Sequence, residues 1–165
     1  MKKINLLWAV LLVAAFLCFA LGSGESKTSD QGSGSANVNT TVAGSIGKYS
    51  VVIDSCRLAT DYEGKPIVIV KYIFTNVSND DATAFYVAFE DHVYQNGVGL
   101  NEAYILSDSA NYSSDNQMKE IKKGATIEVE VAYELNDTNT EIEVEVEELF
   151  SFNDSKITKK FTIAG

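Results

Sequence analysis

TIEVEVAYEL at residues 126–135 and EIEVEVE at residues 141–147 decide the fold of this chain. In both stretches apolar residues alternate with other residues, most of which are glutamates. Successive side chains of a β-strand point to opposite faces, so this period of two predicts strands with one buried face and one solvent face. The loop at 136–140 is short and polar, and we therefore predict that the two strands pair as a hairpin.

The same reasoning extends to the rest of the chain after residue 47. Five further stretches rich in Tyr, Val, Ile and Phe are predicted strands, at 48–58, 67–75, 82–94, 98–106 and 156–163. Turn-forming residues separate them, among them Gly64 and the pair Asn96-Gly97, which is typical of a tight hairpin. About seven short strands without a convincing amphipathic helix predict an all-β protein, and specifically an antiparallel β-sandwich.

The first 22 residues have the pattern of an export signal. Two lysines follow Met1, an apolar run of about 18 residues ends at residue 21, and small residues close it. We predict cleavage after Gly22. Two alternatives stay open: the run is long enough to be retained as an N-terminal membrane anchor, or Cys18 carries a lipid. Leu17 argues against the second, because lipoprotein processing prefers a small residue directly before the cysteine.

Residues 23–47 separate this signal from the predicted strands. They are rich in Gly, Ser, Thr and Asn and contain no aromatic residue, so they bury too little apolar surface to fold alone. We predict a flexible linker at 23–47 and one folded domain at 48–165. The protein is then expected outside the cytoplasmic membrane, either secreted or anchored to its outer face by the N-terminal segment.

The charge of the chain excludes several classes of partner. It contains 13 Lys and Arg against 23 Asp and Glu, a net charge of −10, and loss of the two signal lysines makes this −12. Nucleic acids and anionic lipid headgroups need a basic surface, so neither is an expected partner. Membrane contact is therefore expected only through the N-terminal segment, while cations and basic partners remain compatible with the charge.

Several short segments resemble a known family. They read KYIFTNVS at 71–78, YQNGVGL at 94–100, and IKKGAT at 121–126 running into VAYEL at 131–135. In this order they resemble the bacterial family of exported proteins and lipoproteins with domain of unknown function 5067, related to small secreted immunogenic β-sandwich proteins. The resemblance covers about 48–163 and implies an immunoglobulin-like fold and a cell-surface setting. It implies no activity and no catalytic residues.

Acidic side chains are the most unusual feature of the predicted strands. If the two strands pair as a hairpin, one face carries Glu128, Glu130, Glu134, Glu141, Glu143, Glu145 and Glu147. The simplest interpretation is a solvated face whose charge prevents edge-to-edge aggregation. The alternative is an interaction face for basic partners or divalent cations, made by Glu128, Glu130, Glu141, Glu143 and Glu145.

The loop between these strands is a weak candidate for calcium. Asn136, Asp137, Asn139 and Glu141 offer alternating oxygen ligands, but the loop is shorter than an EF-hand loop and lacks its glycine. No metal ligand set built on cysteine or histidine is evident in the sequence, and no cofactor motif is found.

We expect no enzymatic activity. The only histidine, His92, has no nucleophile spaced around it, and Cys56 reads as a small buried residue in a strand. A surface hydrolase would need a cleft with two carboxylates ~5–10 Å apart. The expected function is a cell-surface interaction or adhesion module for an unknown protein or wall ligand, with Tyr104 and Tyr112 as rigid loop contacts. The alternative function is an acidic cell-wall component that binds divalent cations.

Overall fold

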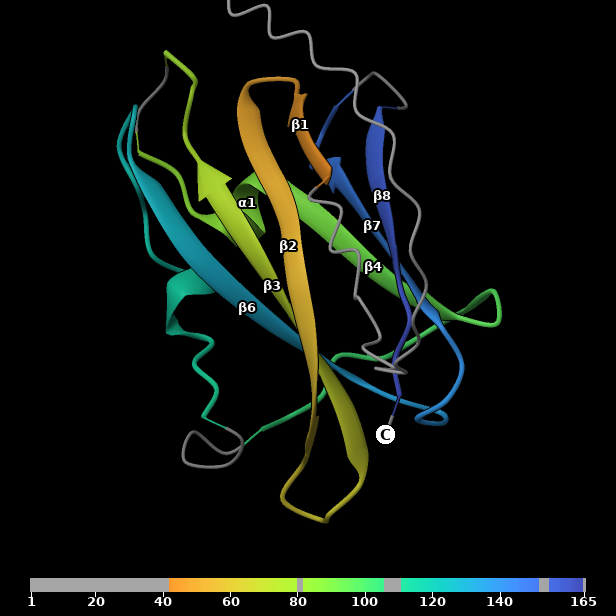
Figure 1. Cartoon of the computed structure of the whole chain (residues 1–165). Coiled ribbons are helices and arrows are strands. Elements are labelled where there is room, and N and C mark those ends of the chain that lie inside the picture. Colours follow the sequence, from red (N-terminus) through yellow and green to blue (C-terminus); the bar gives the residue numbers. More distant parts are fainter. Residues whose placement is uncertain (1–41, 80–81, 106–110, 152–154, 165) are drawn as a thin grey trace, which may run out of the picture. The chain divides into compact units, whose positions relative to one another are not determined.

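The computed structural model describes residues 42–79, 82–105, 111–151 and 155–164 (Figure 1). Two four-stranded antiparallel sheets pack around one hydrophobic core, which confirms the predicted β-sandwich. The predicted signal or anchor at 1–22, with Cys18 and the cleavage at Gly22, lies outside the described residues, as does the linker up to residue 41. Among the described residues, no helix combines the length and the apolar character needed to cross a membrane.

The first sheet has the order β1-β2-β3-β6 and the second the order β5-β4-β7-β8. The strands of the first are β1 (Val42–Ile46), β2 (Tyr49–Thr60), β3 (Pro66–Thr75) and β6 (Thr126–Glu134). The strands of the second are β4 (Phe89–Gln95), β5 (Val98–Gly99), β7 (Ile142–Glu148) and β8 (Lys156–Phe161). One short helix, α1 (Phe85–Ala88), precedes β4, and a 3₁₀ turn, η1 (Asp115–Gln117), precedes β6.

The core lies between the two sheets and is rich in aromatic residues. Phe74 of β3, Phe85 of α1 and Phe89 of β4 pack edge to face or tilted, with ring centroids 5.5 to 6.1 Å apart. Tyr72 is fully buried next to Phe85. Such aromatic pairs stabilise a fold by about 0.5–1.5 kcal/mol beyond the area they bury. Among the residues that the structure describes, the core contains no disulfide, and Cys56 is a free thiol.

The predicted hairpin between 126–135 and 141–147 is wrong. β6 pairs with β3, from Thr75↔Thr126 to Ile67↔Glu134, whereas β7 pairs with β4 and β8. The chain crosses from one sheet to the other between these strands, as Figure 1 shows. The alternating pattern identifies which face of each strand is buried, but two strands facing each other across a sandwich have the same pattern as two paired neighbours.

Three other boundaries differ from the prediction. The stretch 82–94 begins with α1, because Phe85 and Ala88 are buried at helical spacing while Tyr86 and Val87 are exposed. The predicted strand 98–106 pairs with β4 only as β5, after which the chain moves to the edge of β6. Residues 42–46, assigned to the linker, form β1, because this short segment pairs with β2 over its whole length.

Candidate functional site

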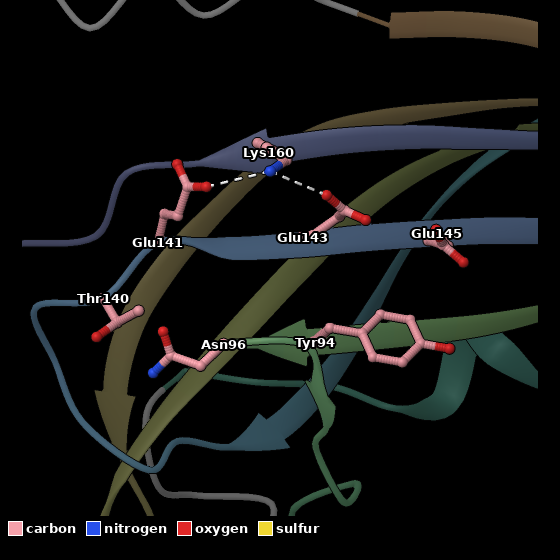
Figure 2. Close-up of a pocket in the computed structure, with 8 residues that line it drawn as sticks. Tyr94, Asn96, Thr140, Glu141, Glu143, Glu145 and Lys160 are labelled. Carbon is pink, nitrogen blue, oxygen red and sulfur yellow. Dashed lines mark hydrogen bonds and ion pairs between the residues drawn. The ribbon is translucent and has the colours of Figure 1, made fainter.

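The outer face of the second sheet carries acidic side chains in alternation with basic ones. Along β7, Glu143 lies between Tyr94 and Lys160 on the neighbouring strands. The Lys160 ammonium lies 3.2 Å from a carboxylate oxygen of both Glu141 and Glu143 (Figure 2). Lys156 of the same strand pairs with Glu145 at 2.8 Å. The lysines of β8 thus offset the repulsion expected from the acidic row on β7.

A shallow hollow of about 430 Å³ lies over this part of the sheet. Tyr94, Asn96 and Thr140 line it together with the Lys160 ion pairs, and Figure 2 shows these side chains around it. The lining is charged, and its charges are paired within the chain. Exposed ion pairs of this kind contribute little to stability, typically about 0–1 kcal/mol.

The other glutamates of the predicted interaction face lie on the other sheet. Glu128 and Glu130 belong to β6, on the outer face of the first sheet. Arg57 of β2 pairs with Glu130 at 3.2 Å, and Lys71 of β3 lies 3.8 Å from Glu128. The prediction that Glu128 and Glu130 share one face with Glu141, Glu143 and Glu145 is therefore wrong, because it depended on the hairpin.

The loop predicted to bind calcium makes hydrogen bonds within itself and to Gln95. The Asp137 carboxylate accepts hydrogen bonds from the backbone N–H groups of Asn139 and Thr140 and from the Thr140 hydroxyl. These bonds lower the pKa of Asp137. Gln95, 1% exposed, accepts from the N–H groups of Asn136 and Asp137 and donates to the carbonyls of Asp137 and Thr140. Glu141 pairs with Lys160, so the two carboxylates among the candidate ligands are engaged in separate turn and surface contacts.

A small cluster of possible metal ligands lies elsewhere on the outer face of the second sheet. Glu90 and Glu147 are partners on β4 and β7, and His92 follows two residues after Glu90 on the same face. One ligand atom from each of the three lies within 4.8 Å of the others. The sequence did not indicate this cluster, since it depends on the register between β4 and β7.

A second hollow, of about 610 Å³ and therefore larger than the one over β7, lies beside β4. Its lining residues come from α1, from β4, from the segment around and after β5, from η1, from β6 and from Leu149. We call it the β4 groove; apolar and aromatic side chains line it together with polar ones, and the polar ones include Glu90, Asp91, His92, Asn101, Glu102 and Gln117. A concave, mostly apolar surface with a few polar groups is the usual form of a binding site.

Asp91 is the central polar group of this groove. The Tyr133 hydroxyl donates to its carboxylate at 2.5 Å. The Tyr72 hydroxyl lies close by, fully buried and without a hydrogen bond of good geometry. Burial raises the pKa of Asp91 even though the tyrosine hydroxyls lower it, and burial together with the charge of Asp91 raises the pKa of Glu102. Burial and the nearby charge of Asp91 also raise the pKa of Tyr72 and of Tyr133.

Sequence comparison identifies the family of the chain. The pattern that defines the domain of unknown function DUF5067 matches residues 24–148. The chain belongs to this family. No curated protein matches it.

Two solved structures are similar to this DUF5067 chain. One, from Staphylococcus aureus and described as a "putative lipoprotein", has a TM-score of 0.54 and 19% identity, over 74% of this chain and 93% of that one. The other, a "putative lipoprotein" from Bacillus subtilis, has a TM-score of 0.56 and 16% identity, over 74% of this chain and 39% of that one. This chain therefore spans less than half of the Bacillus protein. At these identities the likeness concerns the fold alone.

The sequence contained one signal for the groove of the DUF5067 domain that the prediction missed. Phe89, Asp91 and Val93 share one side of β4, and an aspartate between two buried apolar residues marks a charge that faces inward. The loop tyrosines that were predicted as contacts differ from each other. Tyr104 is 78% exposed, whereas Tyr112 packs beside a small cluster outside the first sheet and accepts a hydrogen bond from Gln117.

Proposed function

We propose that this DUF5067 chain is a non-catalytic binding module that works outside the cytoplasmic membrane and binds a partner protein in the β4 groove. The observation that carries the proposal is the groove itself. It combines apolar and aromatic walls with a carboxylate that the fold keeps partly buried at its centre. The paired charges of the outer face offer no comparable feature, since lysines of the same chain already neutralise them.

The location rests on the N-terminal segment and on the similar structures. An apolar segment after two lysines suits export, and both similar structures are described as "putative lipoproteins". Intact mass of the protein recovered from its host tests the proposal. A mature start at Ser23 supports release, an intact Met1 supports an anchor, and a diacylglycerol on Cys18 supports lipidation. Recovery of unmodified protein from the cytosol alone would contradict all three.

Photo-crosslinking in the native host tests the binding proposal. Tyr86 at the mouth of the groove is 50% exposed, and Tyr62 in the turn between β2 and β3 is 57% exposed, so they form a matched pair. A photoreactive phenylalanine at position 86 should form a discrete adduct with another protein, and the same residue at position 62 should not. Adducts at neither position, or equal adducts at both, would contradict a binding site in the groove.

A hydrolase is the competing class, because Asp91 and Glu102 share the groove. The hydroxyl of Tyr133 occupies an oxygen of Asp91, an arrangement that holds the carboxylate in place rather than leaving it free to attack a substrate. We therefore expect no release of reducing ends from purified wall glycan. Release that disappears in both Asp91→Asn and Glu102→Gln would overturn the non-catalytic proposal.

The cluster of Glu90, His92 and Glu147 favours a second candidate function, the binding of a divalent cation. Two carboxylates and one imidazole are ligands that suit zinc and related metals. To test cation binding, the full chain is first treated with a chelator, and thermal melts are then recorded with and without added Zn²⁺ or Ca²⁺. A ligand that binds only the native state raises the melting temperature. A rise that His92→Ala removes and Glu143→Gln keeps would support the cluster. The absence of a rise with either metal would reject it.

A further inference from the structure

One edge of β4 lacks a paired strand around Asp91, between the bond that the Phe89 N–H makes to the Phe85 carbonyl of α1 and the bonds that Val93, Tyr94 and Gln95 make to the segment around β5. On one side β4 pairs with β7 along its whole length, from Phe89 to Gln95. On the other side β5 pairs only with Tyr94 and Gln95, and one further bond joins the Leu100 N–H to the Val93 carbonyl at 2.7 Å. Within the part of the chain that the structure describes, no strand continues this pairing toward Phe89. An open strand edge is a template for another strand.

The segment after β5, which could have paired with this edge of β4, pairs with β6 of the first sheet instead. After Leu100 the chain bonds to β6, where the Asn101 carbonyl accepts from the N–H of Glu134 and the Ala103 N–H donates to Ala132. β4 and the segment after Leu100 therefore separate, and both contribute residues to the β4 groove. Backbone groups alternate in direction along a strand, so Asp91, two residues before Val93, presents its N–H and carbonyl to the groove. The Asp91 carbonyl accepts a long hydrogen bond from the Tyr133 hydroxyl, at 3.4 Å, and its second lone pair is open to a further donor.

The charges that line the groove favour a basic occupant. Its lining residues include the carboxylates of Glu90, Asp91 and Glu102 and the imidazole of His92, which lies 3.4 Å from Glu90, and no lysine or arginine is among them. Phe85 and Tyr86 provide an aromatic wall beside these carboxylates. Aromatic faces suit the alkyl stem and the cation of a lysine or arginine side chain.

We infer that an extended segment of the partner protein adds to the open edge of β4 as a further strand and directs a lysine or arginine side chain toward Asp91. This inference rests on the proposed function and specifies its mode of binding. Backbone hydrogen bonds to Asp91 supply affinity, and the carboxylates supply the preference for a basic residue. A second copy of this chain is a poorer occupant, because antiparallel pairing of two β4 edges would bring two acidic grooves together.

Selection of peptides on the full-length protein tests this mode. The probe is a phage-displayed library of random dodecapeptides, panned on protein immobilised through a C-terminal tag. We expect selected peptides to alternate apolar residues and to contain one lysine or arginine. Asp91→Asn should weaken their binding at least about tenfold, which corresponds to about 1.4 kcal/mol, whereas Glu63→Gln in the β2–β3 turn should leave it unchanged. Urea unfolding of Asp91→Asn verifies that this variant is folded.

Backbone methylation distinguishes strand addition from other binding modes. Strand pairing uses every second N–H group of the peptide. N-methylation at successive peptide positions should therefore lower the affinity at least about tenfold at one position and have little effect at the next. Amide exchange should also slow at Asp91 when the peptide binds. Equal effects at all positions, or unchanged exchange, would refute strand addition. Peptides without a basic residue that bind Asp91→Asn equally well would refute the charge preference.

Two further outcomes separate this inference from the function on which it rests. If no peptide is selected although position 86 forms an adduct in cells, strand addition fails and the binding module stands. If no peptide is selected and position 86 forms no adduct, both strand addition and the proposed binding module fail. A stable dimer in sedimentation that Asp91→Asn strengthens would identify a second copy as the occupant and would overturn the inference.

Discussion

Replacement of Tyr133 by phenylalanine should destabilise the domain, because it removes the hydroxyl that bonds to Asp91. The Tyr133 hydroxyl is part of a ring that is 2% exposed, and it donates to the Asp91 carboxylate at 2.5 Å. Hydrogen bonds to a charged group contribute about 1.5–3 kcal/mol, and the substitution leaves a partly buried carboxylate without this donor. We expect the free energy of unfolding at pH 7 to fall by about 1.5–3 kcal/mol.

Tyr72 provides a matched control for this experiment. It is fully buried in the same cluster, but its hydroxyl makes no hydrogen bond of good geometry. Tyr72→Phe removes the same atom without breaking a bond of good geometry, although this hydroxyl also favours the charged form of Asp91, so the free energy of unfolding should fall by less than for Tyr133→Phe. Urea denaturation, monitored by far-UV circular dichroism, measures the free energy of unfolding of both variants.

The pH dependence gives a second measurement of the same bond. The Tyr133 bond favours the charged form of Asp91, so its loss raises a pKa that burial has already raised. When the pKa of a carboxyl group is higher in the folded state than in the unfolded state, the folded state stays protonated to higher pH. The free energy of unfolding therefore falls as the pH rises above the pKa of the unfolded state. The cost of Tyr133→Phe should therefore be largest at pH 7 and decline toward about 1 kcal/mol near pH 4, where a neutral hydrogen bond is lost. Equal costs for the two tyrosines, or a cost that grows toward pH 4, would refute this reasoning.

Four other predictions concern Asp91, Gln95, Cys56 and the lysines of β8. Because burial raises the pKa of Asp91, the stability of Asp91→Asn relative to the parent should increase between pH 4 and pH 7 in urea unfolding; a decrease would contradict the pKa direction. Gln95→Ala should cost about 2–4 kcal/mol in the same assay, because four backbone groups lose their partner, and a cost below about 1 kcal/mol would show that water replaces it. Burial raises the pKa of Cys56 to about 11, so a disulfide reagent at pH 8 should label it only after urea is added; fast labelling of native protein would refute this. Lys159 is buried and donates to two carbonyls of β2 across the sandwich, so Lys159→Met should cost about 1–3 kcal/mol. The exposed Lys160→Met should lower the melting temperature much less, and equal melting temperatures would contradict the difference.

The sequence by itself determined the fold class and the buried face of most strands. Alternation in β6 and β7 identified Val129 and Val144 as core residues, because burial depends on the side of the strand on which a residue lies. The family segments and the acidic character could also be read directly. These properties are local, since each depends on the neighbours of a residue along the chain.

The pairing of strands and the candidate site were decided only by the tertiary structure. β6 lies beside β3 and β7 beside β4, so Glu128 and Glu143 are on different sheets although their local patterns are the same. The β4 groove depends on the same pairing: Tyr133 meets Asp91 from a segment 42 residues away, at an edge that β5 leaves open. Period-two sequence patterns carry the direction of a side chain but not the identity of its neighbour across the sheet, because that choice depends on how both sheets close over one core.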